Sequence, residues 1–133
     1  MMQTAAETAG GGILVIGVTV LTSLNDDDLK EMGVAHTTEG QVLQLARMAN
    51  EAGLDGVVCS AKEIGMLRRE IGDDFLLITP GIRPEWAAKG DQKRIVTPSD
   101  AFKKGASALV IGRPITGQDD PAAAMRRILD ECA

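Results

Sequence analysis

Four short runs of apolar and β-branched residues are spaced along the chain, and each is followed by a stretch with helical spacing. The runs cover residues 13–21, 56–60, 75–80 and 108–112. Short continuous apolar runs of this kind are typical of strands in a parallel sheet, where both faces are covered. The sequence therefore predicts four parallel strands, each leading into a helix that crosses back over the sheet.

Apolar residues recur at helical spacing between these runs. Residues 38–53 and 61–72 repeat apolar positions three and four apart, and each stretch ends in a glycine. Residues 97–106 carry Pro and Ser near a helix start, and in residues 119–132 Pro121 falls in the first helical turn behind two acids. With a further helix near the amino terminus, the predicted order is one helix followed by four strand–helix units.

Four such units leave the architecture open between two possibilities. The chain has 133 residues, whereas a closed barrel of eight units needs about 250, and an open four-stranded sheet needs cover on both faces. The sequence therefore fits either a small doubly wound domain or part of a barrel. In both cases we expect residues 1–133 to form a single domain, because no linker or low-complexity segment interrupts the pattern.

Composition and charge narrow the classes of partner. The net charge is −5 and no run of Lys or Arg offsets it, which argues against a nucleic-acid or anionic-membrane surface. The longest apolar run is too short to span a bilayer, and residues 1–12 lack the basic and apolar regions of a signal peptide. We expect a soluble protein, and the distant Cys59 and Cys132 fit a reducing, cytoplasmic setting.

Polar residues follow the apolar runs at the end where a parallel sheet binds ligands. Thr22 follows the first run and Ser60 the second. A glycine admits a ligand close to the backbone, and an arginine offers a fork of donors suited to phosphate or carboxylate. Barrel enzymes often build a phosphate site from their last two loops. The groups that we expect to converge on one anion are Arg83, Gln92, the Gly112 amide and Arg113.

Several separate motifs resemble the orotidine 5'-monophosphate decarboxylase family in order and spacing. They are VTVLTS, GLDGVVCSA, TPGIRP, GDQKR, LVIGRPIT and the DP that follows. The resemblance covers essentially all 133 residues, but only the C-terminal half of the family's chain. It implies an α/β fold of four sequential parallel strand–helix units, the C-terminal half of a TIM (β/α)8 barrel.

The resemblance also implies functions for individual residues. It indicates an enzyme that converts orotidine 5'-monophosphate to uridine monophosphate (UMP) and carbon dioxide in pyrimidine biosynthesis, without cofactor or metal, as a cytoplasmic homodimer. Thr22 matches a ligand-contacting threonine, and Ser60 matches the serine that reads the pyrimidine. The phosphate-gripping positions of the family match Arg83, Gln92, Gly112 and Arg113.

The family's catalytic motif, Asp-x-Lys-x-x-Asp, has only a partial match in this sequence. Residues 28–33 read DLKEMG, so Gly33 stands where the second aspartate belongs, and an acidic turn precedes them instead of a strand. We interpret Asp26–Asp28 as a helix start on the surface. We therefore assign no catalytic residue and expect the isolated chain to be inactive. His36 is interpreted as a surface or capping residue, and Glu63 with Glu70 as a solvated helix face.

Three functional interpretations remain open at this point. The chain is half of a decarboxylase, or a non-catalytic remnant that binds a phosphorylated ligand, or part of a related phosphate-binding barrel such as a sugar-phosphate epimerase or decarboxylase. The third class lacks the joint TPGIRP and GDQKR signature. The DNA upstream of the Met1 codon separates the first two, because an in-frame catalytic motif there would identify a longer enzyme.

Overall fold

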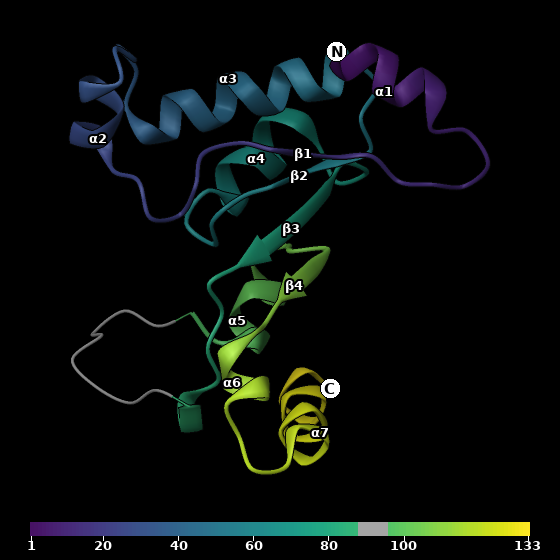
Figure 1. The fold of residues 1–133 in the computed structure, drawn as a ribbon, viewed down its shortest axis with the longest axis vertical. Helices are drawn as coiled ribbons and strands as arrows, with labels where there is room; N and C mark the ends of the chain where they lie inside the picture. The colour runs from purple at the N-terminus through teal and green to yellow at the C-terminus, as the bar shows by residue number, and fades with distance from the viewer. Residues whose placement is uncertain (88–95) are drawn as a thin grey trace.

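The computed structural model describes residues 1–87 and 96–133, and within them four parallel strands form one sheet (Figure 1). The strands are β1 (Ile16–Val18), β2 (Gly56–Val58), β3 (Leu76–Pro80) and β4 (Ala108–Val110). Each strand pairs in parallel with the next one along the chain, in the order β1-β2-β3-β4. The predicted fold of sequential parallel strand–helix units is confirmed.

The helices fall where the apolar spacing predicts them, with two additions. They are α1 (Met2–Thr8), α2 (Asp26–Glu31), α3 (Thr38–Glu51), α4 (Ile64–Ile71), η1 (Glu85–Ala87), α5 (Pro98–Lys103), α6 (Arg113–Thr116) and α7 (Pro121–Cys132). The short helices η1 and α6 are not predicted by the sequence pattern, because Gly-Arg-Pro reads as a turn. None of the described helices is long and apolar enough to cross a membrane.

The two faces of the sheet differ sharply in burial. Val57 and Leu77 face the helix layer and are 1% exposed. The residues that alternate with them lie in register across the four strands, as Val18, Val58, Ile78 and Ala108. On the edge strands of that second face, Val18 is 62% and Val110 53% exposed. In Figure 1 α4 and α5 lie behind the strands and no described helix covers the front. This open face is typical of part of a barrel, not of a doubly wound domain.

The first strand is shorter than its apolar run predicts. β1 lies at an edge of the sheet, so it pairs only with β2, through three residues. Ile13 and Leu14, which precede β1, are exposed. The entry to the strand is fixed by Asp55, whose carboxylate accepts a hydrogen bond from the Val15 N–H at 2.7 Å and whose N–H donates to the Val15 carbonyl at 3.0 Å. The apolar run extends beyond the strand because it has no second neighbour to pair with.

Two glycines permit close packing around β2. A Cβ at Gly56 would lie 2.2 Å from the Leu76 carbonyl oxygen on the neighbouring strand, so no larger residue fits there. A Cβ at Gly17 would lie 3.1 Å from the Leu54 side chain, which fills the space between β1 and the helix layer. Both positions set how closely neighbouring elements approach, which in turn fixes the spacing of the strand ends.

Candidate functional site

The residues predicted to bind a ligand all follow the carboxyl ends of the strands. Thr22 lies after β1, Ser60 after β2, Arg83 after β3, and Arg113 after β4. Because the strands are parallel, these ends meet at one edge of the sheet. The four side chains divide between two separate cavities along that edge.

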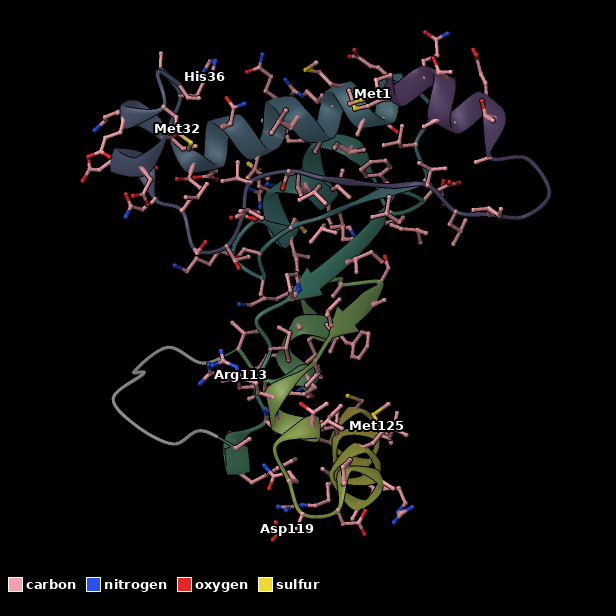
Figure 2. The ribbon with its side chains drawn as sticks, in the orientation of Figure 1. Met1, Met32, His36, Arg113, Asp119 and Met125 are labelled. Carbon is pink, nitrogen blue, oxygen red and sulfur yellow. The ribbon has the colours of Figure 1, made fainter. Side chains whose placement is uncertain are left out.

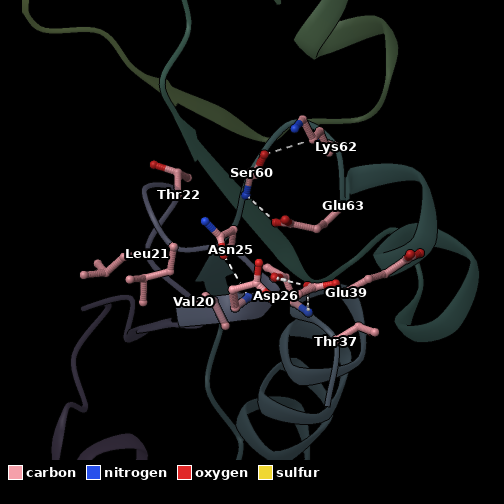
Figure 3. A pocket seen from close by; sticks show the side chains of 13 residues that line it. Val20, Leu21, Thr22, Asn25, Asp26, Thr37, Glu39, Ser60, Lys62 and Glu63 are labelled. Carbon is pink, nitrogen blue, oxygen red and sulfur yellow. Dashed lines mark hydrogen bonds between the residues drawn. The ribbon is translucent and has the colours of Figure 1, made fainter. Parts of the chain in front are cut away.

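The first cavity, here the serine cavity, contains Thr22 and Ser60 and has a volume of about 640 Å³. Figure 3 shows Thr22 and Ser60 toward one end of it and Asp26, Thr37 and Glu39 toward the other. Its walls come from the segment after β1, from the start of α3 and from the link between β2 and α4. Its lining is mostly polar, with Val20, Leu21 and Leu24 as the apolar members, and its volume lies in the range of small-molecule sites.

Ser60 is held by hydrogen bonds to Lys62 and Glu63 at the start of the segment that leads into α4. Its N–H donates to the Glu63 carboxylate at 2.6 Å, and its hydroxyl accepts from the Lys62 N–H at 3.3 Å. The Glu63 N–H in turn donates to the Ser60 carbonyl at 3.0 Å, so Ser60 and Glu63 are tied together by two hydrogen bonds. The prediction that Glu63 belongs to a solvated helix face is wrong, since Glu63 is half-buried and lines the serine cavity beside Ser60.

Charges in the serine cavity follow from burial and hydrogen bonding. Burial raises the pKa of the Glu63 carboxyl above its usual value, and the nearby Glu39 adds to the rise. The hydrogen bond from the Ser60 N–H acts the other way and lowers this pKa. The opposite holds for Asp26, whose pKa is lowered because it accepts hydrogen bonds from the hydroxyl and the N–H of Thr38 at 2.6 and 2.7 Å. Asp26 thereby ties α2 to the start of α3, which forms one wall of the cavity.

The second cavity, here the arginine pocket, brings Arg83 and Arg113 together. It has a volume of about 140 Å³, and its other lining residues are Ala87, Pro114 and Gln118. No carboxylate is among the described residues that line it. Two guanidinium groups without a carboxylate partner favour the binding of an anion, because their positive charges repel each other when no anion lies between them.

Both arginines are carried by short, well-fixed segments. Arg83 lies between Ile82 and Pro84, which are both buried, and its N–H donates to the Val96 carbonyl at 3.2 Å. Arg113 is the first residue of α6, and the Gly112 carbonyl before it accepts from the Ile115 N–H at 2.8 Å. The backbone thus holds the base of each long side chain while leaving its guanidinium group at the cavity.

Gly112 and Gln92 are the other two residues predicted to bind the anion. Gly112 precedes α6 beside the arginine pocket, and a Cβ there would meet nothing within 4 Å, so no packing demand explains the glycine. Gln92 lies outside the described residues, so its predicted convergence on the same anion stays a prediction. Gln118, in the connection between α6 and α7, lines the pocket and was missed by sequence reasoning. Its only sequence signal is a polar side chain shortly after the last strand.

Comparison with known proteins identifies the relatives of this chain. Residues 1–128 match the family model described as "Orotidine 5'-phosphate decarboxylase / HUMPS family". The chain belongs to this family. It is 54% identical to the orotidine 5'-phosphate decarboxylase of Rhodospirillum rubrum and 50% identical to that of Alkalilimnicola ehrlichii, over 98% and 100% of its length. It covers 56% and 58% of those proteins, so it spans a little over half of the relatives that it matches.

Solved structures agree with this assignment. The crystal structure of the orotidine 5'-phosphate decarboxylase from Lactobacillus acidophilus superimposes with a TM-score of 0.83 at 41% identity. The match covers 99% of this chain and 58% of that one. The four-stranded sheet therefore corresponds to part of a decarboxylase-family barrel.

The Asp-Leu-Lys stretch that partly matches the family's catalytic motif lies in α2, where its side chains make local contacts. Asp28 accepts a hydrogen bond from the Asn25 N–H and so caps its own helix, and Lys30 pairs with Asp27 at 3.3 Å on the surface.

His36 lies at the outer end of the connection between α2 and α3, far from Arg113 (Figure 2). No group of metal-ligating side chains large enough to hold an ion occurs in residues 1–87 and 96–133.

Proposed function

We propose that this chain supplies the substrate-binding half of an orotidine 5'-monophosphate decarboxylase, the enzyme that forms UMP and carbon dioxide in pyrimidine biosynthesis. The arginine pocket holds the phosphate group, and the serine cavity, through Ser60 and Thr22, holds the pyrimidine nucleoside. The catalytic Asp-x-Lys-x-x-Asp motif belongs to the part of the family's chain that these residues do not span. The assembled enzyme uses no cofactor, works in the cytoplasm and forms a homodimer.

One observation carries this proposal: Arg83 and Arg113 line one small pocket that has no carboxylate among its described residues. At about 140 Å³ the pocket accommodates a single anionic group and is too small for a whole nucleotide. Guanidinium groups bind phosphate oxygens through several parallel charge-assisted hydrogen bonds. A phosphate that is remote from the reacting carbon contributes binding energy, which the enzyme uses to stabilise the transition state.

The neighbouring serine cavity supports the nucleoside half of the proposal. Its volume of about 640 Å³ suits a base and a sugar, and Ser60 is fixed there by its hydrogen bonds to Lys62 and Glu63. The two cavities lie along the same edge of the sheet, the serine cavity at β1 and β2 and the arginine pocket at β3 and β4. A nucleotide that reached from one cavity to the other would place its base and its phosphate at different strand ends.

The test compares a nucleotide with its nucleoside. In the 133-residue chain Arg113→Ala should weaken UMP binding about tenfold, because it removes a charge-assisted contact that is partly screened by solvent. Uridine binding should change little, since uridine has no phosphate. Isothermal titration measures both affinities. Arg126→Ala, which removes an exposed arginine of α7 outside the pocket, is the matched control. Equal losses for UMP and uridine would mean that Arg113 maintains the fold and does not bind phosphate.

A further inference from the structure

A cation–π contact joins the C-terminal helix to the turn that follows Arg83. The guanidinium carbon of Arg127, on α7, lies 4.1 Å from the centre of the Trp86 ring, on η1. No ion pair of Arg127 occurs among the described residues, although four carboxylates line the adjoining cavity with it, those of Glu85, Asp100, Asp130 and Glu131. The tryptophan ring is therefore the partner that the described residues offer this guanidinium group.

The η1 turn forms a wall shared by two cavities. Ala87 lines the arginine pocket, whereas Trp86 lines the cavity of about 950 Å³ on the other side, between η1, α5 and α7. The turn is short, with the Ala87 N–H bonded to the Pro84 carbonyl at 3.0 Å. A shift of Trp86 therefore moves Ala87 and the backbone next to Arg83.

The same helix also supports the second arginine of the pocket. Arg113 begins α6, and α7 packs against α6 and α5. The separation between Arg83 and Arg113 thus depends on how η1 is held against α7. Because the two like charges repel each other, that separation has to be fixed by the scaffold before an anion binds.

We propose that Arg127 is a positioning residue that acts through Trp86, holding η1 against α7 and thereby setting the distance between Arg83 and Arg113 that one phosphate group needs. This inference rests on the proposed phosphate-binding role of the pocket. It assigns a function to an arginine that lines neither the serine cavity nor the arginine pocket.

The chain offers a direct probe of the contact. Trp86 is its only tryptophan, and it has no tyrosine, so its fluorescence reports on this site alone. Arg127→Gln should shift the emission to longer wavelength and increase quenching by acrylamide, since the ring loses its cover. Arg127→Lys keeps a cation and should stay close to the original protein. Arg126→Gln, the same charge change one residue earlier and outside both neighbouring cavities, should leave the emission unchanged.

Two further measurements test positioning as distinct from local packing. Hydrogen exchange of the Arg83 N–H, which is bonded to the Val96 carbonyl, should accelerate roughly three- to tenfold in Arg127→Gln, in line with the strength of a partly exposed cation–π contact. The dissociation constant for inorganic phosphate should rise by a similar factor in Arg127→Gln, and Arg127→Lys should recover most of the affinity. Thermal unfolding of each variant verifies that the fold is retained.

The outcomes separate this inference from the proposed function. Unchanged Arg83 exchange in Arg127→Gln overturns the positioning role, and so does an equal loss of phosphate affinity in Arg126→Gln and Arg127→Gln, which would indicate only bulk charge. If the original chain binds no phosphate but Arg127→Gln still accelerates Arg83 exchange, the phosphate role fails and the positioning role stands. Arg113→Ala should weaken phosphate binding about tenfold without moving the Trp86 emission.

Discussion

Arginine residues in this chain serve two different purposes, and the difference lies in what their guanidinium groups contact. Arg68 donates to the carbonyls of Gly105, Gly72 and Phe75 at 2.6 to 2.9 Å and to the Ser107 hydroxyl at 2.9 Å. Among the described residues the side chains of Arg83 and Arg113 donate no such bonds. A guanidinium group with its donors satisfied inside the protein is structural, whereas one that faces a cavity with free donors is available to a ligand.

Removal of Arg68 should therefore destabilise the fold without affecting the ligand site. Arg68 joins the end of α4 to the segment between α5 and β4, at the edge of the sheet opposite the cavities. We expect Arg68→Ala to lower the free energy of unfolding by about 2–3 kcal/mol, because several part-buried carbonyls lose their donor. Arg68→Lys should recover only part of this, since lysine lacks the planar fork.

Urea unfolding measures the change, and Arg69→Ala provides the control. Arg69 is the next residue on α4 and is exposed, with no side-chain hydrogen bond among the described residues. A loss of stability in Arg69→Ala as large as that in Arg68→Ala would show that helix propensity, not the carbonyl contacts, is responsible.

At the scale of single elements, the link from β2 to α4 joins Ser60, which we propose binds the nucleoside, to a carboxyl group with a shifted pKa. Glu63 accepts the Ser60 N–H, and burial raises its pKa above the usual 4.5. The folded state thus favours protonated Glu63 more than the unfolded state does. The resulting contribution to stability is present below pH 4.5 and is lost as the pH rises through the raised pKa of the folded state.

Glu63→Gln should remove this pH dependence while keeping an oxygen acceptor for Ser60. As the pH rises from 4.5 toward 7, the free energy of unfolding of the original chain should fall relative to that of Glu63→Gln. Urea unfolding at several pH values measures the difference. Glu51→Gln, at the exposed end of α3, is the matched control. The same pH-dependent difference in Glu51→Gln would contradict the assignment to Glu63.

The elements also show how far sequence reasoning reaches. Helices with regular apolar spacing, such as α3, were predicted almost residue for residue, because their pattern and packing agree. β1 is shorter than predicted because an edge strand pairs on one side only. The strand-end positions of Ser60 and Arg113 followed from parallel topology. The sequence did not predict that Ser60 and Arg113 line separate cavities, that Glu63 lies beside Ser60, or that Gln118 lines the arginine pocket. These features depend on distances between neighbouring elements, which the order of the sequence does not contain.

At the scale of the whole molecule, the sheet is apolar on a face that no described helix covers. Val18 and Val110 are exposed on its two edge strands, and each edge strand pairs with only one neighbour. A barrel of this class closes at eight strands, and the chain spans 56% of the Rhodospirillum rubrum decarboxylase. The open face and both edges are therefore where we expect the rest of a barrel to pack.

Completion of the barrel should restore catalysis. We expect the 133-residue chain alone to release no carbon dioxide from orotidine 5'-monophosphate. We expect turnover once it is mixed with the part of the Rhodospirillum rubrum enzyme that it does not span, because our proposal assigns the acid and electrostatic groups to that part. Release of labelled carbon dioxide from carboxyl-labelled substrate measures both cases.

Val18→Asp and Val110→Asp test whether assembly uses the open face. Each places a carboxylate where closure of the barrel buries a valine, so the recovered activity should fall roughly tenfold or more. Met48→Asp, an exposed apolar position on α3, should cost little. Equal losses at Met48 and Val18 would mean that the open face is not the assembly surface.

A stable complex that binds UMP but releases no carbon dioxide would instead favour a non-catalytic, phosphate-binding protein. Turnover by the chain alone would refute the assignment of catalysis to the remaining segment.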